Sequence, residues 1–420
     1  MKIHSSSFRL PLFSALCLFA LASVIGQAGE QGGVKSVSNR QKPLETKAST
    51  PAFADWGNRP NEPFVNGKAN FEQVKSELLK NYYNKDLSEN DLYRAAVQGM
   101  LTYIDPSKSA WHTLYTPTEY KELTSDMEGE ISGVGMQTKF DDITGYTSVA
   151  GVIPGSPAEK AGLKAGDQIL KINGKSARRM ELRDLVYQIR GKAGTDVKLT
   201  IFHDESIKEF TLRRQQLTVE SGTFDMLPEG TGLLKIHNFS ASSPQTLKKI
   251  VATFKDKGVK SLVVDLRGNE GGLLDSSLEV IRMFIPKGRT IVKMVERGAT
   301  VKEVKADGEP MITGIPLVLL INGETKSGAE IMAAALKMSA GATVVGTPTF
   351  GKWSAQRLEV LPNNYAIKYT TATFLPPSGP DLNGKGLNPD FHVVEGDTAA
   401  EKGAKDVQLQ AALQLIASKR

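Results

Sequence analysis

Two side chains in the second half of the chain could carry out chemistry together, those of Ser327 and Lys352. Ser327 comes shortly after an apolar run, residues 316–321, which ends at an Asn-Gly turn signal and therefore predicts a buried strand. Residues 328–338 predict a helix, so Ser327 stands where a strand ends and a helix begins. Such a corner suits a nucleophile, because the hydroxyl is exposed and the free N–H groups of the helix face any negative charge that forms beside it.

A structural role for Ser327 stays open beside the catalytic one. Ser-x-x-Glu before an apolar helix is a capping box, in which Ser327 and Glu330 each bind the backbone N–H of the other. Lys352 favours catalysis, because a neutral lysine can take the proton of a serine. Burial must then lower its pKa from about 10.4 toward about 7–8. Phe350 and Trp353 are the expected walls of such a pocket, and a solvated loop lysine is the alternative.

A glycine-rich loop supplies a further chemical element. Residues 265–272 read Asp-Leu-Arg-Gly-Asn-Glu-Gly-Gly, follow a predicted buried strand and open a predicted helix. Glycines before a helix present free N–H groups, which an oxyanion needs. We expect the N–H of Gly271 or Gly272, together with that of Gly328, to hold the oxyanion. A tight turn that serves only the fold is the alternative, and Arg267 is expected to be structural.

These segments resemble the C-terminal processing peptidases, which are serine–lysine proteases of the tail-specific type. The family pattern is Asn-x-x-Ser-Ala-Ser-Ala-Ser-Glu, followed by Thr-Phe-Gly-Lys-Gly-x-x-Gln. Aligned on Asn322 and Glu330, it implies that Ser327 is the nucleophile, Lys352 the base and Gln356 the glutamine that supports the base. The chain departs from the pattern at Glu324-Thr325-Lys326 in the small-residue run, at Glu270 in place of proline and at Trp353 in place of glycine.

A second motif lies in the middle of the chain. Residues 156–175, SPAEKAGLKAGDQILKINGK, resemble a PDZ domain of the bacterial protease type. In such a domain an extended peptide adds as a strand, and backbone N–H groups capture its terminal carboxylate. The resemblance implies a carboxylate cradle at Gly133, Val134, Gly135 and Met136. It also implies a side-chain pocket on the helix predicted over 182–189, with candidates Leu185, Val186 and Ile189.

The chain divides into regions of different composition. Lys2 and Arg9 precede an apolar run and small residues, which predicts a secretory signal peptide, with a retained membrane anchor as the alternative. A polar, Gly- and Ser-rich stretch then predicts a disordered lead-in. The predicted organisation is a signal peptide over 1–28, a disordered lead-in over 29–66, an N-terminal helical domain over 67–127, a PDZ domain over 128–215, a serine protease core over 216–400 and a C-terminal helix over 401–420.

Strands and helices alternate from Gly232 onward, with two antiparallel runs, 356–361 and 365–374, added near the end. We therefore expect an α+β multidomain chain with an N-terminal helical region, a β-rich PDZ domain and an α/β protease core. The resemblance implies that this core is crotonase-like and that the N-terminal helices form a homodimer. Packing of those helices on their own chain is the alternative.

Composition narrows the function further. The chain has 420 residues, a net charge of +6 and one cysteine, Cys17, which lies inside the predicted signal peptide. An exported protein without disulfides fits a bacterial periplasm. Basic clusters with interleaved aromatic residues are absent, so no nucleic-acid partner is expected. The histidines are scattered, without His-Glu-x-x-His, and no Gly-x-Ser-x-Gly occurs, which disfavours a metal or histidine hydrolase. No metal or other cofactor is expected.

Two functional hypotheses follow from these features. The first is a periplasmic serine endopeptidase whose PDZ domain catches proteins with exposed apolar C-termini and whose Ser327–Lys352 dyad cleaves through an acyl-enzyme. It would sit at the inner membrane if the signal peptide is retained, and an adaptor lipoprotein is left open as a partner. The second is a catalytically inactive PDZ scaffold that binds periplasmic C-termini.

Overall fold

The computed structural model describes residues 64–105, 111–141, 144–218, 220–298, 301–394 and 406–418. All described residues belong to one compact unit, Trp56–Arg420. The predicted signal peptide and nearly all of the predicted lead-in lie outside the described residues. Within the described part of the chain, no helix combines the length and the apolar character needed to cross a membrane.

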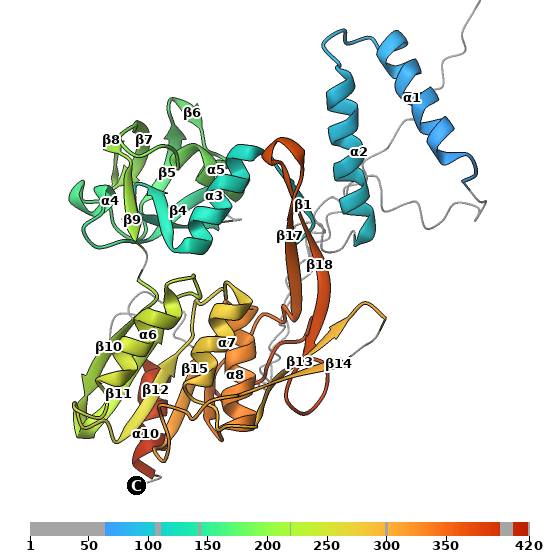
Figure 1. Ribbon diagram of the computed structural model, residues 1–420. Coiled ribbons are helices and arrows are strands. Elements are labelled where there is room, and N and C mark those ends of the chain that lie inside the picture. The colour runs from blue at the N-terminus through green and yellow to red at the C-terminus, as the bar shows by residue number, and fades with distance from the viewer. Residues whose placement is uncertain are drawn as a thin grey trace, which may run out of the picture. The chain divides into compact units, whose positions relative to one another are not determined.

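Two helices begin the described chain, α1 (Gly67–Asn81) and α2 (Glu89–Ile104) (Figure 1). Helix α2 starts at a capping box, in which the Ser88 hydroxyl accepts from the Asp91 N–H and the Asp91 carboxylate accepts from the Ser88 N–H. The start of the region predicted to be helical, 67–127, therefore does contain helices. Their packing is sparse, because α1 has no buried residue and α2 buries only one.

The PDZ region is an antiparallel sheet in the order β3-β4-β5-β7-β8, with β6 on β5 (Figure 1). Its apolar side chains alternate along the strands and enclose one core, which includes Ile169, Leu185 and Ile201. The elements are β3 (Met136–Asp141), β4 (Tyr146–Val152), α4 (Pro157–Lys160), β5 (Gln168–Ile172), β6 (Lys175–Ser176), α5 (Leu182–Ile189), β7 (Asp196–His203) and β8 (Ser206–Arg213). Strand β2 (Glu130–Gly133) comes before this sheet in the chain and β9 (Gln215–Thr218) after it, and the two pair with each other as a separate antiparallel sheet.

The core sheet has the order β10-β11-β12-β15-β16-β19 and is parallel except at β10. Buried parallel strands read as continuous apolar runs, which is why residues 316–321 predict β15. The strands are β10 (Gly222–Leu227), β11 (Thr231–Ile236), β12 (Ser261–Asp265), β15 (Leu317–Ile321), β16 (Thr343–Gly346) and β19 (Phe391–His392); a 3₁₀ turn, Pro228–Gly230, joins β10 to β11.

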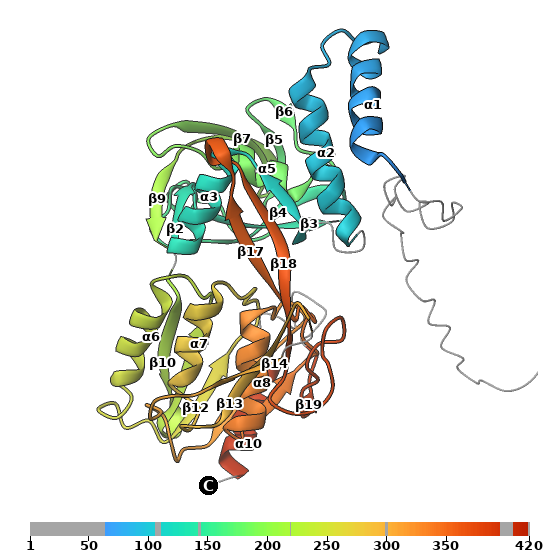
Figure 2. The same cartoon turned by 45° about the vertical axis from the view of Figure 1, so that its right-hand side comes forward.

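Helices cover both faces of this sheet (Figures 1 and 2). On one face, α6 (Ser243–Ala252), α7 (Leu274–Arg282) and α8 (Gly328–Ser339) enclose the main apolar cluster. On the other face, α10 (Val407–Ser418) packs Ala412 and Ile416 against the sheet. The predicted C-terminal helix is thus present as a layer of the core.

A second sheet lies beside the first and has the order β1-β18-β13-β14, with β17 on β18. The predicted hairpin is present, and β17 and β18 run side by side as a long ribbon (Figures 1 and 2). Its strands are β1 (Thr113–Tyr115), β13 (Thr290–Glu296), β14 (Val301–Lys305), β17 (Ser354–Val360) and β18 (Ala366–Leu375). A 3₁₀ turn, Pro362–Asn364, joins β17 to β18, and helix α3 (Pro117–Glu128) follows β1 in the chain.

Strand β1 departs from the expected division of the chain. It belongs to the region predicted to be helical, yet it pairs with β18, Thr113 opposite Lys368 and Tyr115 opposite Ala366. The mixed α+β architecture is confirmed, and the crotonase-like description of the core stays a prediction.

Candidate active site

Ser327 stands at the corner that the sequence predicts, between β15 and α8. Its φ is 54° and its ψ is −119°, outside the regions that L-residues ordinarily adopt. Such backbone strain persists only where the surrounding structure imposes it, and it is frequent at functional sites. The turn that leads to Ser327 is tied down, since the Thr325 hydroxyl donates to the Leu266 carbonyl at 2.9 Å and accepts from the Asn322 N–H at 3.0 Å.

The capping pair of Ser327 and Glu330 is present, but it leaves the hydroxyl free of a cap hydrogen bond. The Ser327 N–H donates to the Glu330 carboxylate at 3.0 Å, and the Glu330 N–H donates to the Ser327 carbonyl at 2.9 Å. The structural role of this serine therefore uses its backbone, which leaves Oγ available for chemistry.

Glu330 has a second function that the sequence analysis missed. Its carboxylate is completely buried and accepts three further hydrogen bonds, from the Thr349 hydroxyl at 2.6 Å, the Gly351 N–H at 2.7 Å and the Lys352 N–H at 2.7 Å. One side chain thus joins the Ser327 corner to the loop that carries Lys352. The only sequence signal was the capping pattern, which is local and does not show a second partner.

Lys352 is half-buried and lines a cavity of about 540 Å³ that Ser327 also lines. Burial lowers the pKa of Lys352, as a base of this kind requires. The expected walls are placed differently. Phe350 is half-exposed beside Lys326, and the Trp353 side chain packs in the main core.

The aromatic group over the lysine comes from a distant segment. The Lys352 Nζ lies 5.6 Å from the centre of the Trp111 ring. Within the described residues, no hydrogen bond joins Lys352 Nζ to Ser327 Oγ. Both groups face the same cavity, so a substrate that enters it meets both.

Gln356 lines this cavity as well. Its amide nitrogen donates to the Ser354 hydroxyl at 2.9 Å and is within 3.4 Å of the Thr370 hydroxyl. The described residues contain no hydrogen bond between Gln356 and Lys352. The predicted support of the lysine by this glutamine therefore stays a prediction.

The three predicted oxyanion glycines all line the same cavity. The Gly271 N–H is already used, since it donates to the Asn269 side-chain oxygen at 2.8 Å. The hydrogen bonds of the described chain leave the N–H groups of Gly272 and Gly328 as the available donors. Gly271 instead permits close approach, because a Cβ there would stand 2.9 Å from the Gly328 nitrogen.

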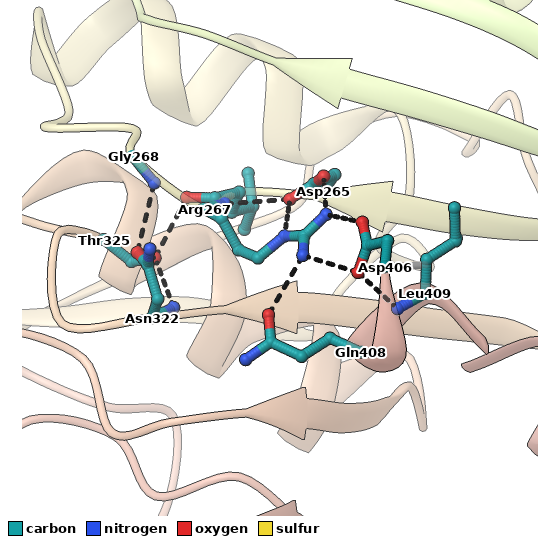
Figure 3. Close-up of polar contacts among 9 residues, drawn as sticks. Asp265, Arg267, Gly268, Asn322, Thr325, Asp406, Gln408 and Leu409 are labelled. Atoms are coloured by element: carbon teal, nitrogen blue, oxygen red, sulfur yellow. Dashed lines mark hydrogen bonds and ion pairs between the residues drawn. The ribbon is translucent and has the colours of Figure 1, made fainter. Parts of the chain in front are cut away.

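Arg267 anchors this loop to the end of the chain, as Figure 3 shows. Its guanidinium donates to both oxygens of Asp265, at 2.9 and 2.7 Å, and to both oxygens of Asp406, at 3.0 and 2.7 Å. It also donates to the Gln408 side chain at 3.0 Å. Burial opposes the charge of Arg267, but these carboxylates outweigh it and raise its pKa. The structural role expected for Arg267 agrees with this geometry.

The remaining walls of the cavity are mainly apolar. They come from α3, the loop after β11, the start of α7, helix α8 and strands β17 and β18: Leu123, Met127, Phe239, Leu273, Leu274, Ile331, Ala355, Leu358 and Phe374. Among the described residues, no group of three or more His, Cys, Asp or Glu side chains could hold a metal ion.

A second groove, a cavity of about 660 Å³, lies beside β3 and is lined by the PDZ region and by Gly268, Glu270 and Glu324 of the core. The predicted cradle residues Gly133, Val134, Gly135 and Met136 line it, as do Val186 and Ile189 of α5. Leu185 does not, because it points into the PDZ core with none of its surface exposed. The helix turns about 100° per residue, which places Leu182 on the groove side with Val186 and Ile189.

Strand β3 is an edge strand, so its outer side is open to another strand. The loop before it is fixed by hydrogen bonds to its carbonyl oxygens, from Ala158 to Val134 and from Ile153 to Gly135, both at 2.9 Å. A Cβ on Gly135 would stand 2.3 Å from the Ser156 Cβ, so only glycine fits there.

Comparisons with known proteins agree with both motifs. Residues 230–393 match the family model described as peptidase family S41, and residues 148–201 match the model of a PDZ domain. The chain is 33% identical over 330 residues to the carboxy-terminal processing protease CtpA of Bacillus subtilis, in an alignment that covers 78% of this chain and 68% of that protein.

A second relative is similar over a larger share of its length. The chain is 34% identical over 357 residues to a carboxyl-terminal-processing protease of a Picosynechococcus species, covering 83% of each protein. Among solved structures, the photosystem II D1 C-terminal processing protease matches with a TM-score of 0.55 and 24% identity, over 80% of this chain and 96% of that one. This last likeness shows a shared fold.

Proposed function

This chain belongs to peptidase family S41, among the PDZ-containing carboxyl-terminal-processing serine proteases, and on that premise we propose that it cleaves proteins with a Ser327–Lys352 dyad. Its substrates are proteins with exposed apolar C-terminal tails, and its site of action is the periplasm. The observation that supports the dyad is the buried Glu330 carboxylate, which binds backbone N–H groups of both Ser327 and Lys352 and so brings their side chains to one cavity.

The reaction proceeds through an acyl-enzyme. The neutral Lys352 amine takes the proton of Ser327 Oγ, which attacks the scissile carbonyl carbon. The Gly272 and Gly328 N–H groups bind the oxyanion as it forms. The carbon–nitrogen bond then breaks, and the Lys352 ammonium gives its proton to the leaving amine. Lys352 then deprotonates a water molecule, whose oxygen attacks the ester carbon. The bond from that carbon to Ser327 Oγ breaks, and the Lys352 ammonium returns its proton to Oγ.

Substrate capture takes place in the PDZ groove. The tail adds as a strand along the open edge of β3, and its carboxylate binds the backbone of the loop that contains Gly135. Leu182, Val186 and Ile189 offer apolar contacts to its last side chains. This selects apolar tails, since a charged side chain would lose its hydration there.

The proposal is tested by cleavage of an unfolded protein that carries an apolar C-terminal tail. The unsubstituted protein should cleave it, also in EDTA, whereas Ser327→Ala and Lys352→Ala should not, although both should still bind the tail. Lys385→Ala, at an exposed lysine, is the matched control and should cleave normally. Cleavage by Ser327→Ala would refute the dyad, and absence of cleavage by every form would favour the scaffold that only binds tails.

We also propose that the N-terminal helices mediate homodimerisation. Large apolar side chains are exposed along both helices: Val74, Leu79, Met100, Tyr103 and Ile104. Sedimentation should give a dimer that Met100→Glu combined with Ile104→Glu converts to a monomer. A monomer at micromolar concentration of the unsubstituted protein would contradict this.

A further inference from the structure

A second lysine stands in the active-site cavity. Lys368 lies on β18, is half-buried and lines the same cavity as Ser327 and Lys352. It comes from a different strand from the proposed base, and no part of the mechanism above uses it. The charge of a half-buried cation lowers the pKa of a basic amine beside it.

Two aromatic rings from one short segment cover the two lysines. The Lys352 Nζ lies 5.6 Å from the Trp111 ring centre, and the Lys368 Nζ lies 5.4 Å from the Tyr115 ring centre. Both rings belong to β1 or the residues just before it, and β1 pairs with β18 opposite Lys368. An aromatic face can hold an ammonium group at this distance without neutralising it.

The other charged groups around the cavity are mostly engaged with each other. Glu270, from the loop before α7, pairs with Lys326 at 2.6 Å. Asp126 of α3 pairs with Arg190. Within the described residues, neither Lys352 nor Lys368 forms a salt bridge.

Glu330 of α8 accepts a hydrogen bond from the Lys352 N–H, and the charges of Glu330 and Glu270 oppose the effect of Lys368 by raising the pKa of Lys352. Two ammonium groups in one partly buried cavity repel each other, and the repulsion is relieved when one of them loses its proton. Burial is the main cause that lowers the pKa of Lys352, and the charge of Lys368 is the second.

We propose that Lys368 is a positioning residue of the peptidase, whose fixed positive charge in the active-site cavity favours the unprotonated Lys352 amine. This inference rests on the proposed function, because it assigns Lys368 a role that acts only through the Lys352 base. Tyr115 holds the Lys368 ammonium in place, and Trp111 covers the Lys352 amine.

The test is the pH profile of kcat/KM for cleavage of the tailed substrate. Removal of the charge in Lys368→Met raises the pKa of Lys352, so the acid limb should move to higher pH by about one unit. On that limb the activity should fall by about tenfold, while the plateau at high pH stays close to that of the unsubstituted protein. Lys368→Arg keeps the charge and should keep the position of the limb.

Several outcomes would overturn the inference. A merely structural role would lower the whole profile of Lys368→Met without moving its acid limb. If the acid limb of Lys368→Met lies at the same pH as that of the unsubstituted protein, the charge of Lys368 does not affect Lys352. Lys368→Gln, which keeps a polar side chain, is the second variant in case Lys368→Met fails to fold, and it should show the same shift.

The failure of this inference is distinguishable from failure of the proposed function. If cleavage survives Ser327→Ala or Lys352→Ala, the dyad is wrong whatever Lys368 does. If both abolish cleavage and the Lys368→Met and Lys368→Gln limbs stay in place, the dyad stands and Lys368 has no part in it.

Discussion

Replacement of Glu330 by glutamine tests whether one carboxylate holds the two catalytic segments together. Oε1 accepts from the Thr349 hydroxyl and the Gly351 N–H, and Oε2 accepts from the N–H groups of Lys352 and Ser327. The glutamine amide places an NH₂ group where one carboxylate oxygen was. The two groups that donated to that oxygen then face another donor and lose their hydrogen bonds. Each lost hydrogen bond to a charged acceptor costs about 1.5–3 kcal/mol, so the free energy of unfolding should fall by roughly 3–6 kcal/mol.

Urea unfolding followed by tryptophan fluorescence measures this change. Trp353 is a suitable reporter, because it is 1% exposed and adjoins Lys352. Glu279→Gln is the matched control, since Glu279 is exposed on α7, and it should change stability by less than about 0.5 kcal/mol. A loss of less than about 1 kcal/mol in Glu330→Gln would refute the reasoning, since a single lost hydrogen bond costs more than that.

Activity gives an independent reading of the same variant. Under conditions where Glu330→Gln is folded, kcat should fall by about 100-fold, because a displacement of about 1 Å in catalytic groups costs that much. The affinity for a tail peptide should not change, because none of the PDZ groove residues contacts this carboxylate. Unchanged kcat would show that Glu330 does not position the dyad.

Three further outcomes are expected. Gly271→Ala should abolish cleavage, because its Cβ would stand 2.9 Å from the Ser327 Cβ in the nucleophile turn. Gly288→Ala has a similar positive φ, +81° against +93°, but nothing within 4 Å, and should retain activity in the same assay. Burial opposes ionisation of Asp406, but the hydrogen bond from Arg267 outweighs it and holds the pKa of Asp406 below its usual value. That contribution to stability is present above about pH 4 and is lost as the pH falls through the lowered pKa, so urea unfolding of Asp406→Asn should show less acid dependence than the unsubstituted protein. Gly135→Ala should weaken binding of a fluorescent tail peptide by at least about tenfold. Unchanged binding would show that the loop at Gly135 does not bind the carboxylate of the tail.

The sequence determined the elements whose signals are local. The run 316–321 predicts β15 because a strand buried on both faces must be apolar throughout. The helices α5, α8 and α10 follow from apolar spacing, and the corner at Ser327 follows from the order of strand and helix. The motifs around Ser327 and Lys352 further predicted the family, which the comparisons confirm.

Contacts between distant segments were decided only by the tertiary structure. Phe350 and Trp353 adjoin Lys352 in sequence, yet the ring over the lysine belongs to Trp111, because β1 pairs with β18 across more than half of the chain. Whether Gly271 or Gly272 can donate to the oxyanion depended on the Asn269 side chain, which accepts the Gly271 N–H. Periodicity records which face of an element is apolar, but it does not record which other element covers that face, and the chemistry of this cavity depends on such partners.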